Sequence, residues 1–230
     1  LDDTIAKEPL MVLRETTGRS GKPQVTAEDQ SGSTALVAVV TPRHVVVANS
    51  GDCQALLLQS ATEGGAPAEG PWSSLRVSTI HKPDLDTERS RIEAAGSTVE
   101  KHDDQGPLRV NGDLATSRAL GDFKFKRAVG LLPEKQAVTA FPDICVHERM
   151  QGDELLVMAC DGVWDVMGDS DVLGLMQAEL QDKAVVSAPE LAHACDCLVK
   201  RCIDSRDNIT AIAVSISGSI GRVEKKLDFN

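Results

Sequence analysis

The sequence has little of what marks a membrane protein, a nucleic-acid-binding protein or a repeat protein. Its apolar run at residues 35–40 is far shorter than the ~20 residues that cross a bilayer, and the N-terminus has no basic segment followed by an apolar run. The formal net charge is −11, and Lys and Arg are interspersed with acids instead of forming a basic stripe. No internal repeat is visible. These absences predict a soluble protein that binds neither membranes nor nucleic acids.

The six cysteines form neither a disulfide framework nor a zinc-binding pattern. Cys145 and Cys160 lie in apolar runs typical of strands, and Cys195 and Cys202 fall on the apolar face of a predicted helix. Cys195 and Cys197 are separated by one residue, and no second pair follows at zinc-site spacing. We therefore expect reduced thiols in the core and an intracellular, reducing compartment: the cytoplasm, the nucleus or an organelle matrix.

The length of 230 residues fits one large domain with a single core, and we expect a monomer. Residues 1–30 are polar and are predicted to form an irregular N-terminal segment, with a loop at residues 18–23. The packed domain is predicted over residues 31–217. Residues 218–230 are polar and are predicted to form a C-terminal tail.

Apolar runs separated by short turns predict several strands buried on both faces. The first two runs cover residues 33–40 and 45–48, and a third follows at residues 54–58. Three strands in such close succession predict an antiparallel meander within a sandwich. Two later strands are predicted at residues 155–159 and 209–216.

Two helices have clear start and stop signals. Pro83 and Gly96 bracket a short, charged helix over residues 84–95. A later helix opens at Ser187, with Glu190 placed three residues on as in a capping box. Strands and helices together predict an α+β fold. The apolar face of the later helix is predicted to hold Leu191, Ala194, Cys195, Leu198 and Cys202.

Two carboxylates stand at the ends of predicted core strands. Asp161 follows one strand directly and precedes Gly162, and the pair Asp207-Asn208 precedes another strand. Glycine lets the backbone turn sharply there, so a hard oxygen ligand is held at a rigid strand end, as Mg²⁺ or Mn²⁺ requires. If the two strands are neighbours, the end of one meets the start of the other. Their carboxylates can then converge on one metal ion.

These acidic corners also have an ordinary structural interpretation. Asp before Gly is a common turn pair, and Asp-Asn is common in loops. Asp52 and Asp122 each follow a glycine in the same way, and we expect both to hydrogen-bond their turns instead of binding metal.

Five ordered blocks resemble the protein phosphatase type-2C family, a family of metal-dependent protein serine/threonine phosphatases. The resemblance covers residues 31–217. In chain order the blocks are Ser31-Gly32-Ser33-Thr34-Ala35 with Ala48-Asn49-Ser50-Gly51-Asp52; His81-Lys82-Pro83 with Glu88, Arg91-Ile92 and Ala94-Ala95-Gly96; Arg109-Val110-Asn111-Gly112 with Ser117-Arg118-Ala119-Leu120-Gly121-Asp122; Ala159-Cys160-Asp161-Gly162-Val163-Trp164-Asp165-Val166-Met167; and Ser205-Arg206-Asp207-Asn208-Ile209-Thr210.

The resemblance implies an αββα sandwich, two antiparallel sheets flanked by helices, with two Mn²⁺ or Mg²⁺ ions activating a water that attacks phosphoserine or phosphothreonine in protein substrates. It makes Asp161 and Asp207 metal ligands. Asp165 matches a residue at a weaker third metal, but its usual aspartate partner before the His-Lys-Pro motif is replaced by Ile80. A structural role for Asp165 therefore stays open.

Several basic residues have two possible roles. The resemblance places Arg109 and Arg118 near the mouth of the active site, although buried arginines more commonly pair with Asp or Glu. Lys124, Lys126 and Arg127 lie in a segment that matches the family's variable flap. They are expected either to attract phosphoprotein substrates or to be solvated surface charge.

The sequence departs from the family pattern in one respect: it contains no Asp-Gly-His. In the family that motif supplies the carboxylate that bridges the metals and the general acid, and a nearby arginine binds the phosphate. Glu28-Asp29 resembles the motif's acidic neighbours but directly abuts the Ser-Gly block, so we interpret it as a loop coincidence.

Two hypotheses account for this departure. In the first, the catalytic residues lie upstream of Leu1, and the 230-residue chain alone is inactive or unstable because strand edges and a core face are exposed. In the second, the chain is a catalytically dead relative that acts as a binding or regulatory module.

Overall fold

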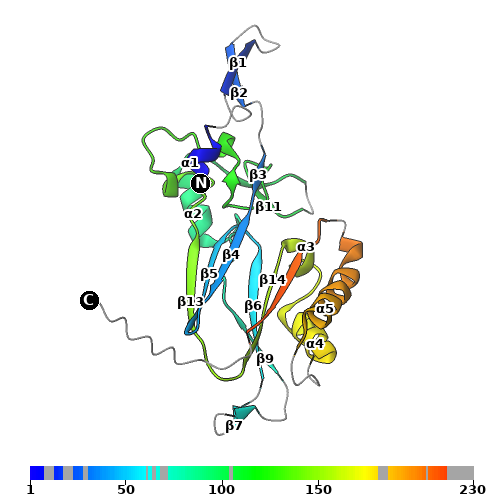
Figure 1. Ribbon diagram of the computed structural model, residues 1–230. Helices are drawn as coiled ribbons and strands as arrows, with labels where there is room; N and C mark the ends of the chain where they lie inside the picture. The colour runs from blue at the N-terminus through cyan, green and yellow to red at the C-terminus, as the bar shows by residue number, and fades with distance from the viewer. Residues whose placement is uncertain are drawn as a thin grey trace, which may run out of the picture. The chain divides into compact units, whose positions relative to one another are not determined.

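The computed structural model describes residues 1–7, 13–17, 23–27, 31–60, 62–63, 66–67, 72–103, 106–180, 186–205 and 207–216. The chain is divided into two compact units, each assembled from segments distant in the sequence (Figure 1). The first unit comprises residues 1–37, 48–53 and 79–143, and the second comprises residues 38–47, 54–78 and 144–230.

The second unit contains a four-stranded antiparallel sheet with the strand order β15-β14-β6-β9. Its two central strands, β6 (Gln54–Gln59) and β14 (Asp153–Ala159), are almost wholly buried. The edges are β15 (Ala211–Ser215) and β9 (Ser73–Arg76). Both strands that the sequence predicts after residue 150 are present, and they are neighbours.

Two helices, α4 (Asp169–Leu180) and α5 (Ala188–Arg201), pack beside this sheet (Figure 1). Their apolar residues join those of β6 and β14 in one core, because each helix presents an apolar stripe to the sheet. The helix predicted from Ser187 is therefore confirmed. Of its predicted core-facing residues, Ala194, Leu198 and Cys202 are fully buried and Leu191 packs against the core.

A second, three-stranded sheet has the order β13-β5-β4. Its strands are β4 (Ala35–Val40), β5 (His44–Ser50) and β13 (Asp143–Glu148). The predicted pairing of the first two runs is confirmed, but the predicted meander is wrong, because β6 belongs to the four-stranded sheet. The chain changes sheets at Gly51, whose φ of +127° favours glycine.

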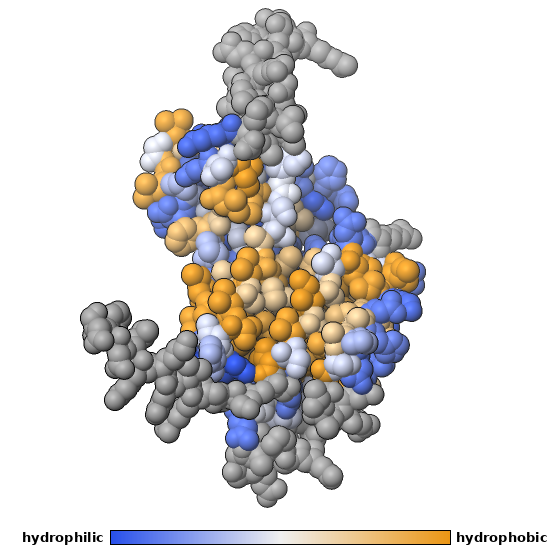
Figure 2. All heavy atoms as spheres, viewed as in Figure 1, coloured by the Kyte–Doolittle hydropathy of each residue, from blue (hydrophilic) through white to orange (hydrophobic). Residues whose placement is uncertain are grey.

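Burial on both faces, predicted for the first strands, is also wrong for β4. Val39 and Val40 on β4 are exposed, as are Ile144 and Val146 on β13. Burial alternates along β13 because a sheet packed on one face leaves every second side chain in solvent. Figure 2 shows apolar side chains gathered in the area of these strands.

The first unit contains helix α2 (Asp86–Ala94), which confirms the helix predicted over residues 84–95. A small apolar core forms around Ile92 and Val110. The strands and 3₁₀ helices of this unit are β3 (Gly32–Ser33), β10 (Val99–Lys101), β11 (Leu108–Val110), β12 (Leu120–Gly121), η2 (Phe123–Phe125) and η3 (Pro133–Lys135), with β10 paired to β11 and β12 to β3.

The N-terminal segment is more regular than predicted. It contains a short helix, α1 (Asp2–Ile5), and an antiparallel pair, β1 (Leu13–Thr17) with β2 (Pro23–Ala27). Several residues of this pair are β-branched, which favours strands. Most of the predicted loop at residues 18–23, and all of the predicted tail at residues 218–230, lie outside the described residues.

The remaining short elements lie in the second unit. The six cysteines are free thiols, as predicted, but only Cys202 is buried; the other five are half-buried, so the predicted position in the core is wrong for them. Among the described residues, no helix is long and apolar enough to cross a membrane. The short elements are β7 (Thr62–Glu63), β8 (Ala66–Pro67), α3 (Asp161–Trp164) and η4 (Ile203–Ser205).

Candidate functional site

Asp161 lies at the junction between strand β14 and helix α3. The strand ends at Ala159, and α3 begins two residues later with Cys160 as its N-cap. The indole Nε1 of Trp164 donates a 2.8 Å hydrogen bond to the carbonyl oxygen of Ala159, and the amide of Asp165 donates one of 2.8 Å to the carbonyl oxygen of Asp161. These bonds fasten α3 to the end of the strand. The half-buried Asp161 is thus held on a short, well-anchored turn.

Asp207 approaches the same sheet end from strand β15. Strands β14 and β15 are antiparallel with Ala159 opposite Ala211, so the end of one adjoins the start of the other. Beyond the ladder, the Cys160 amide donates to the carbonyl oxygen of Thr210 at 3.2 Å, and the Cys160 thiol donates to the carbonyl oxygen of Asn208 at 3.1 Å. The two acidic corners therefore meet at one end of the sheet.

The backbones of the two corners touch at Gly162. A Cβ atom added to this residue would lie 2.3 Å from the carbonyl oxygen of Asn208, a distance that real Cβ atoms essentially never show. Only glycine permits this approach. The sequence suggested that Gly162 serves the turn, and the structure adds that it makes room for the neighbouring corner.

The donor set suits a hard divalent cation. Asp207 is exposed, and its Oδ1 accepts a 2.7 Å hydrogen bond from the Asn208 amide. Mg²⁺ is commonly bound through one or two carboxylates, with water and substrate phosphate completing its shell, and Asp161 and Asp207 match that requirement. Among the described residues, neither belongs to a cluster of three or more potential ligands.

Asp165 is exposed one helical turn beyond Asp161. The two other glycine-linked aspartates, Asp52 and Asp122, are buried in the first unit. Burial raises the pKa of Asp122, and its carboxylate occupies the space where a side chain on Gly32 would lie.

Arg118 is occupied by structural partners in the first unit. Its Nη2 donates to Glu88 Oε1 at 2.7 Å, and its Nη1 donates to Asp143 Oδ1 at 2.8 Å. Glu88 also accepts hydrogen bonds from Ser117 Oγ at 2.5 Å and from Arg91 Nη1 at 2.7 Å. The side chain of Glu88 is 2% exposed and that of Arg118 is 12% exposed. This geometry favours the buried ion pair over substrate contact for Arg118.

The network shifts the pKa values of its members in the direction that keeps them charged. Burial alone would raise the pKa of Glu88, but hydrogen bonds from Arg118, Ser117 and Arg91 outweigh it and hold that pKa below its ordinary value. Burial likewise opposes the lowered pKa of Asp143, which results from bonds donated by His81 and Arg118. The pKa of Arg118 is raised because its two carboxylate partners outweigh desolvation.

The other basic residues are mostly tied to neighbours. Arg109 donates to the carbonyl oxygen of Asp113 at 2.8 Å, and Lys124 pairs with the carboxylate of the same residue at 2.5 Å. Lys126 is nearly buried and contacts Asp2 Oδ2 at 2.7 Å. Burial lowers the pKa of Lys126 despite that ion pair. Arg127 is exposed, so of the three flap cations it best fits a solvated charge.

Two features of this region were missed from the sequence. Glu88 and Arg91 are three residues apart on α2, which indicates a helical ion pair but not its burial beneath Arg118. Asp2 lies in the segment predicted to be irregular, yet its carboxylate accepts a 2.8 Å hydrogen bond from the Gly121 amide. Glu28-Asp29 lies outside the described residues.

Known proteins resemble this chain in both sequence and structure. The protein phosphatase 2C family model matches residues 2–209. A protein phosphatase 2C homolog 2 from Hypocrea jecorina is 38% identical over 81% of this chain and 40% of that relative, and one from Schizosaccharomyces pombe is 40% identical over 80% and 44%. The crystal structure of a Toxoplasma gondii phosphatase has a TM-score of 0.60 and 34% identity, covering 78% of this chain and 52% of that one.

The chain belongs to the protein phosphatase 2C family. It has the mixed α+β fold of that family, with several antiparallel sheets and flanking helices. The family match begins at residue 2 and so includes the N-terminal segment, which precedes the five blocks that resemble the family. The chain spans about 40% of the length of the curated relatives that it matches.

Proposed function

We propose that the protein is a metal-dependent protein serine/threonine phosphatase that hydrolyses phosphoserine and phosphothreonine in phosphoproteins. One observation supports this most directly: the Asp161 and Asp207 corners meet at one end of the four-stranded sheet, with Gly162 allowing their backbones to touch. The family's αββα sandwich is proposed for the whole domain. The six free cysteines support an intracellular, reducing compartment.

Asp161 and Asp207 would hold Mn²⁺ or Mg²⁺, two ions in the complete site. When bound, such ions supply a more acidic water and neutralise charge on the phosphoryl oxygens. The contribution of this chain is positioning: α3 fixes Asp161 at the strand end, and the bonds of Cys160 to residues 208 and 210 keep Asp207 beside it. A general acid for the leaving alkoxide is expected from the family's Asp-Gly-His motif, which this sequence lacks.

The metal-binding part of the proposal is tested by titrating the chain with Mn²⁺ in a calorimeter. Asp161→Asn and Asp207→Asn should each lower the affinity by more than about 100-fold, because even indirect partners of a metal are worth about 10–100-fold. Asp204→Asn, an exposed carboxylate on η4 close by in sequence, is the matched control and should bind as the parent does. Unchanged Mn²⁺ binding in both ligand variants would overturn the assignment.

The phosphatase activity is tested separately, on the natural full-length protein. Release of phosphate from a phosphothreonine peptide should require Mn²⁺ or Mg²⁺ and should be lost in Asp161→Asn and Asp207→Asn. Mn²⁺ binding without phosphate release would favour the alternative, a catalytically dead relative that serves as a binding or regulatory module.

A further inference from the structure

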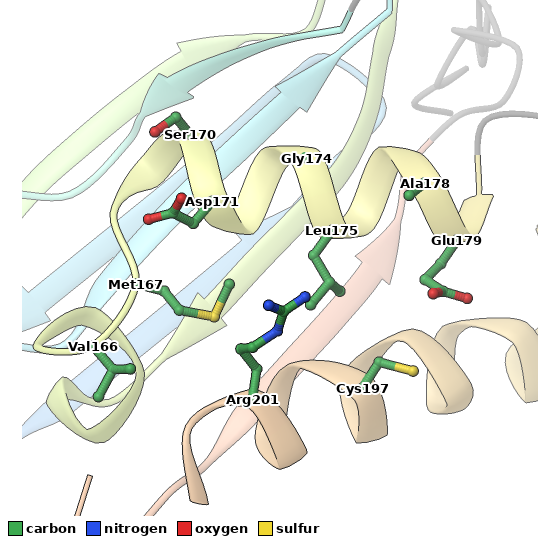
Figure 3. Close-up of a pocket in the computed structure, with 10 residues that line it drawn as sticks. All are labelled: Val166, Met167, Ser170, Asp171, Gly174, Leu175, Ala178, Glu179, Cys197 and Arg201. Carbon is green, nitrogen blue, oxygen red and sulfur yellow. The ribbon is translucent and has the colours of Figure 1, made fainter. Parts of the chain in front are cut away.

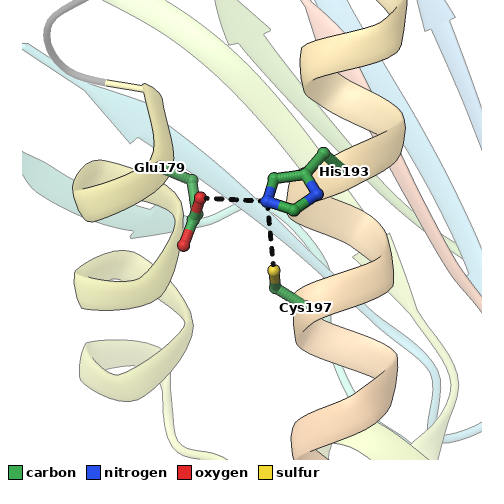
Figure 4. A group of neighbouring side chains, drawn as sticks. All are labelled: Glu179, His193 and Cys197. Atoms are coloured by element: carbon green, nitrogen blue, oxygen red, sulfur yellow. Dashed lines mark hydrogen bonds and ion pairs between the residues drawn. The ribbon is translucent and has the colours of Figure 1, made fainter.

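Three side chains with different metal-binding atoms meet between helices α4 and α5. Glu179 lies in the last turn of α4, and His193 and Cys197 lie one turn apart on α5 (Figure 4). One oxygen, one nitrogen and one sulfur atom from these residues all lie within 4.8 Å of one another. Among the described residues, this is the one cluster of three or more potential ligands.

The imidazole of His193 bridges the other two side chains, through a long hydrogen bond with the Cys197 thiol and a contact at ion-pair distance with Glu179. His193 Nε2 is 3.6 Å from Glu179 Oε2, beyond the range of an N–H···O hydrogen bond. It is 3.7 Å from Cys197 Sγ. Zinc binds nitrogen and oxygen at about 2.0–2.2 Å and sulfur at about 2.3 Å, so tetrahedral angles put such ligand atoms roughly 3.4–3.6 Å apart. The two separations from His193 Nε2 are close to those that a shared ion requires, and the ligand atoms of Glu179 and Cys197 lie within 4.8 Å of each other.

The two helices supply the rigidity that a metal site needs. The Glu190 carboxylate accepts hydrogen bonds from the amide and the hydroxyl of Ser187, at 2.8 and 2.7 Å, which fixes the start of α5. Ala194 and Leu198 each follow one ligand by a single position, about 100° round the helix, and both are fully buried in the core. His193 and Cys197 are therefore presented away from the core, four residues apart on one helix face.

A groove beside the cluster gives a dissolved ion access. It has a volume of about 670 Å³ and is lined by residues of α4, α5 and the turn between α3 and α4 (Figure 3). Glu179 and Cys197 lie at one end of this groove, while Val166 and Met167 lie at the other. His193 itself is largely exposed, with 65% of its side chain accessible.

We propose that Glu179, His193 and Cys197 form a Zn²⁺ site that links α4 to α5, with water as the fourth ligand. A thiolate and an imidazole favour Zn²⁺ over the hard ions Mg²⁺ and Mn²⁺, so this site differs in chemistry from the carboxylate corner at Asp161 and Asp207. It does not depend on the proposed phosphatase activity. The three ligands are of different residue types and come from two helices, so no cysteine spacing in the sequence indicates this site.

The ligand set is tested with metal alone, on the reduced chain. One Zn²⁺ per chain should bind at high affinity, and Co²⁺ in its place should give a thiolate-to-metal charge-transfer absorption band. Cys197→Ser should abolish that band and weaken Zn²⁺ binding more than about 100-fold. Cys195→Ser removes a thiol from the same helix but outside the cluster and should leave both unchanged.

Two further measurements make the result decisive. Bound Zn²⁺ should raise the melting temperature of the parent chain, since an ion that binds only the folded state stabilises it, and this rise should vanish in Glu179→Gln. Asp161→Asn and Asp207→Asn should keep this high-affinity Zn²⁺ site. Equal Zn²⁺ affinity and equal Co²⁺ spectra in Cys197→Ser and Cys195→Ser would overturn the proposal, as would loss of binding in Asp161→Asn.

Discussion

The buried carboxylate of Glu88 is kept charged by hydrogen bonds from three side chains. Replacing it by Gln keeps the shape but removes the charge that faces Arg118 and Arg91. Breaking one partner of a buried ion pair costs about 3–5 kcal/mol, because the remaining charge is left uncompensated. We expect Glu88→Gln to lower the free energy of unfolding by that amount, measured by urea denaturation.

The exposed ion pair between Lys124 and Asp113 is the matched control for that experiment. The side chain of Asp113 is 62% exposed, and exposed pairs contribute at most about 1 kcal/mol. Asp113→Asn should therefore change the free energy of unfolding far less than Glu88→Gln. Equal losses in the two variants would show that Glu88 is not held in a buried network.

Gly162 provides a second prediction at a single position. In Gly162→Ala the added methyl group meets the carbonyl oxygen of Asn208, so the two acidic corners must separate. We expect a loss of several kcal/mol in unfolding free energy, at the upper end of single substitutions. Gly174→Ala, in the middle of α4 with nothing within 4 Å of the new Cβ, should instead stabilise the chain by up to about 1 kcal/mol. A tolerated Gly162→Ala would contradict the close approach.

The candidate metal ligands can be predicted from the sequence, whereas the long-range contacts of Gly162 and Arg118 cannot. Asp161 and Asp207 are visible in the sequence because each stands beside an apolar strand and a turn residue, which are local signals. The approach of Gly162 to Asn208 joins residues 46 positions apart, and no local pattern encodes it. The same holds for Arg118, whose partner lies on α2, a separate element.

At the scale of elements, the N-cap of α5 makes a contribution to stability that a single substitution can measure. Ser187→Ala removes the hydroxyl that contacts Glu190 and weakens the N-cap, at a cost of about 1 kcal/mol. Thermal unfolding should show the loss. Ser90→Ala is the control, because the Ser90 hydroxyl only bonds back to the Asp86 carbonyl within α2, and its removal should change stability by less than about 0.5 kcal/mol.

The positions of individual helices and strands were predicted well from the sequence, but the pairing of strands within sheets was predicted less well. The helix signals at Pro83, Gly96 and Ser187 are properties of a few adjacent residues, so both helices were located from sequence. The transfer of β6 to the four-stranded sheet depends on its pairing with β14, about a hundred residues later in the chain. Short apolar strands in succession do not specify which sheet each one joins.

At the scale of the whole molecule, the match of the family model to residues 2–209 spans parts of both compact units. The metal ligands that the sequence predicts both lie in the second unit, whereas the buried charge network lies entirely in the first. Stability and metal binding can therefore be altered separately. Variants of Glu88 should affect the stability of the first unit, and variants of Asp207 should affect metal binding.

The buried network in the first unit predicts how the stability of the chain depends on pH. Glu88 and Asp143 have pKa values below their ordinary values of 4.5 and 3.8, so the unfolded chain binds protons more readily than the folded one. Their contribution is fully present above about pH 4.5 and is lost as pH falls through the lowered pKa values. Asp122 opposes them, because its raised pKa favours the folded state at low pH. Because Glu88 and Asp143 both lose their contribution in acid and only Asp122 opposes them, we expect stability to fall on acidification.

Glu88→Gln tests this pH dependence directly, because glutamine resembles the protonated acid. The difference in unfolding free energy between the parent and Glu88→Gln should be largest at neutral pH, where Glu88 is charged. It should shrink as the pH falls below about 4.5 and Glu88 becomes protonated. Urea denaturation of both proteins across this range measures the difference. A difference that stays constant with pH would mean that the Glu88 pKa is the same in the folded and unfolded chains, contrary to the hydrogen bonds that Arg118, Ser117 and Arg91 donate to it.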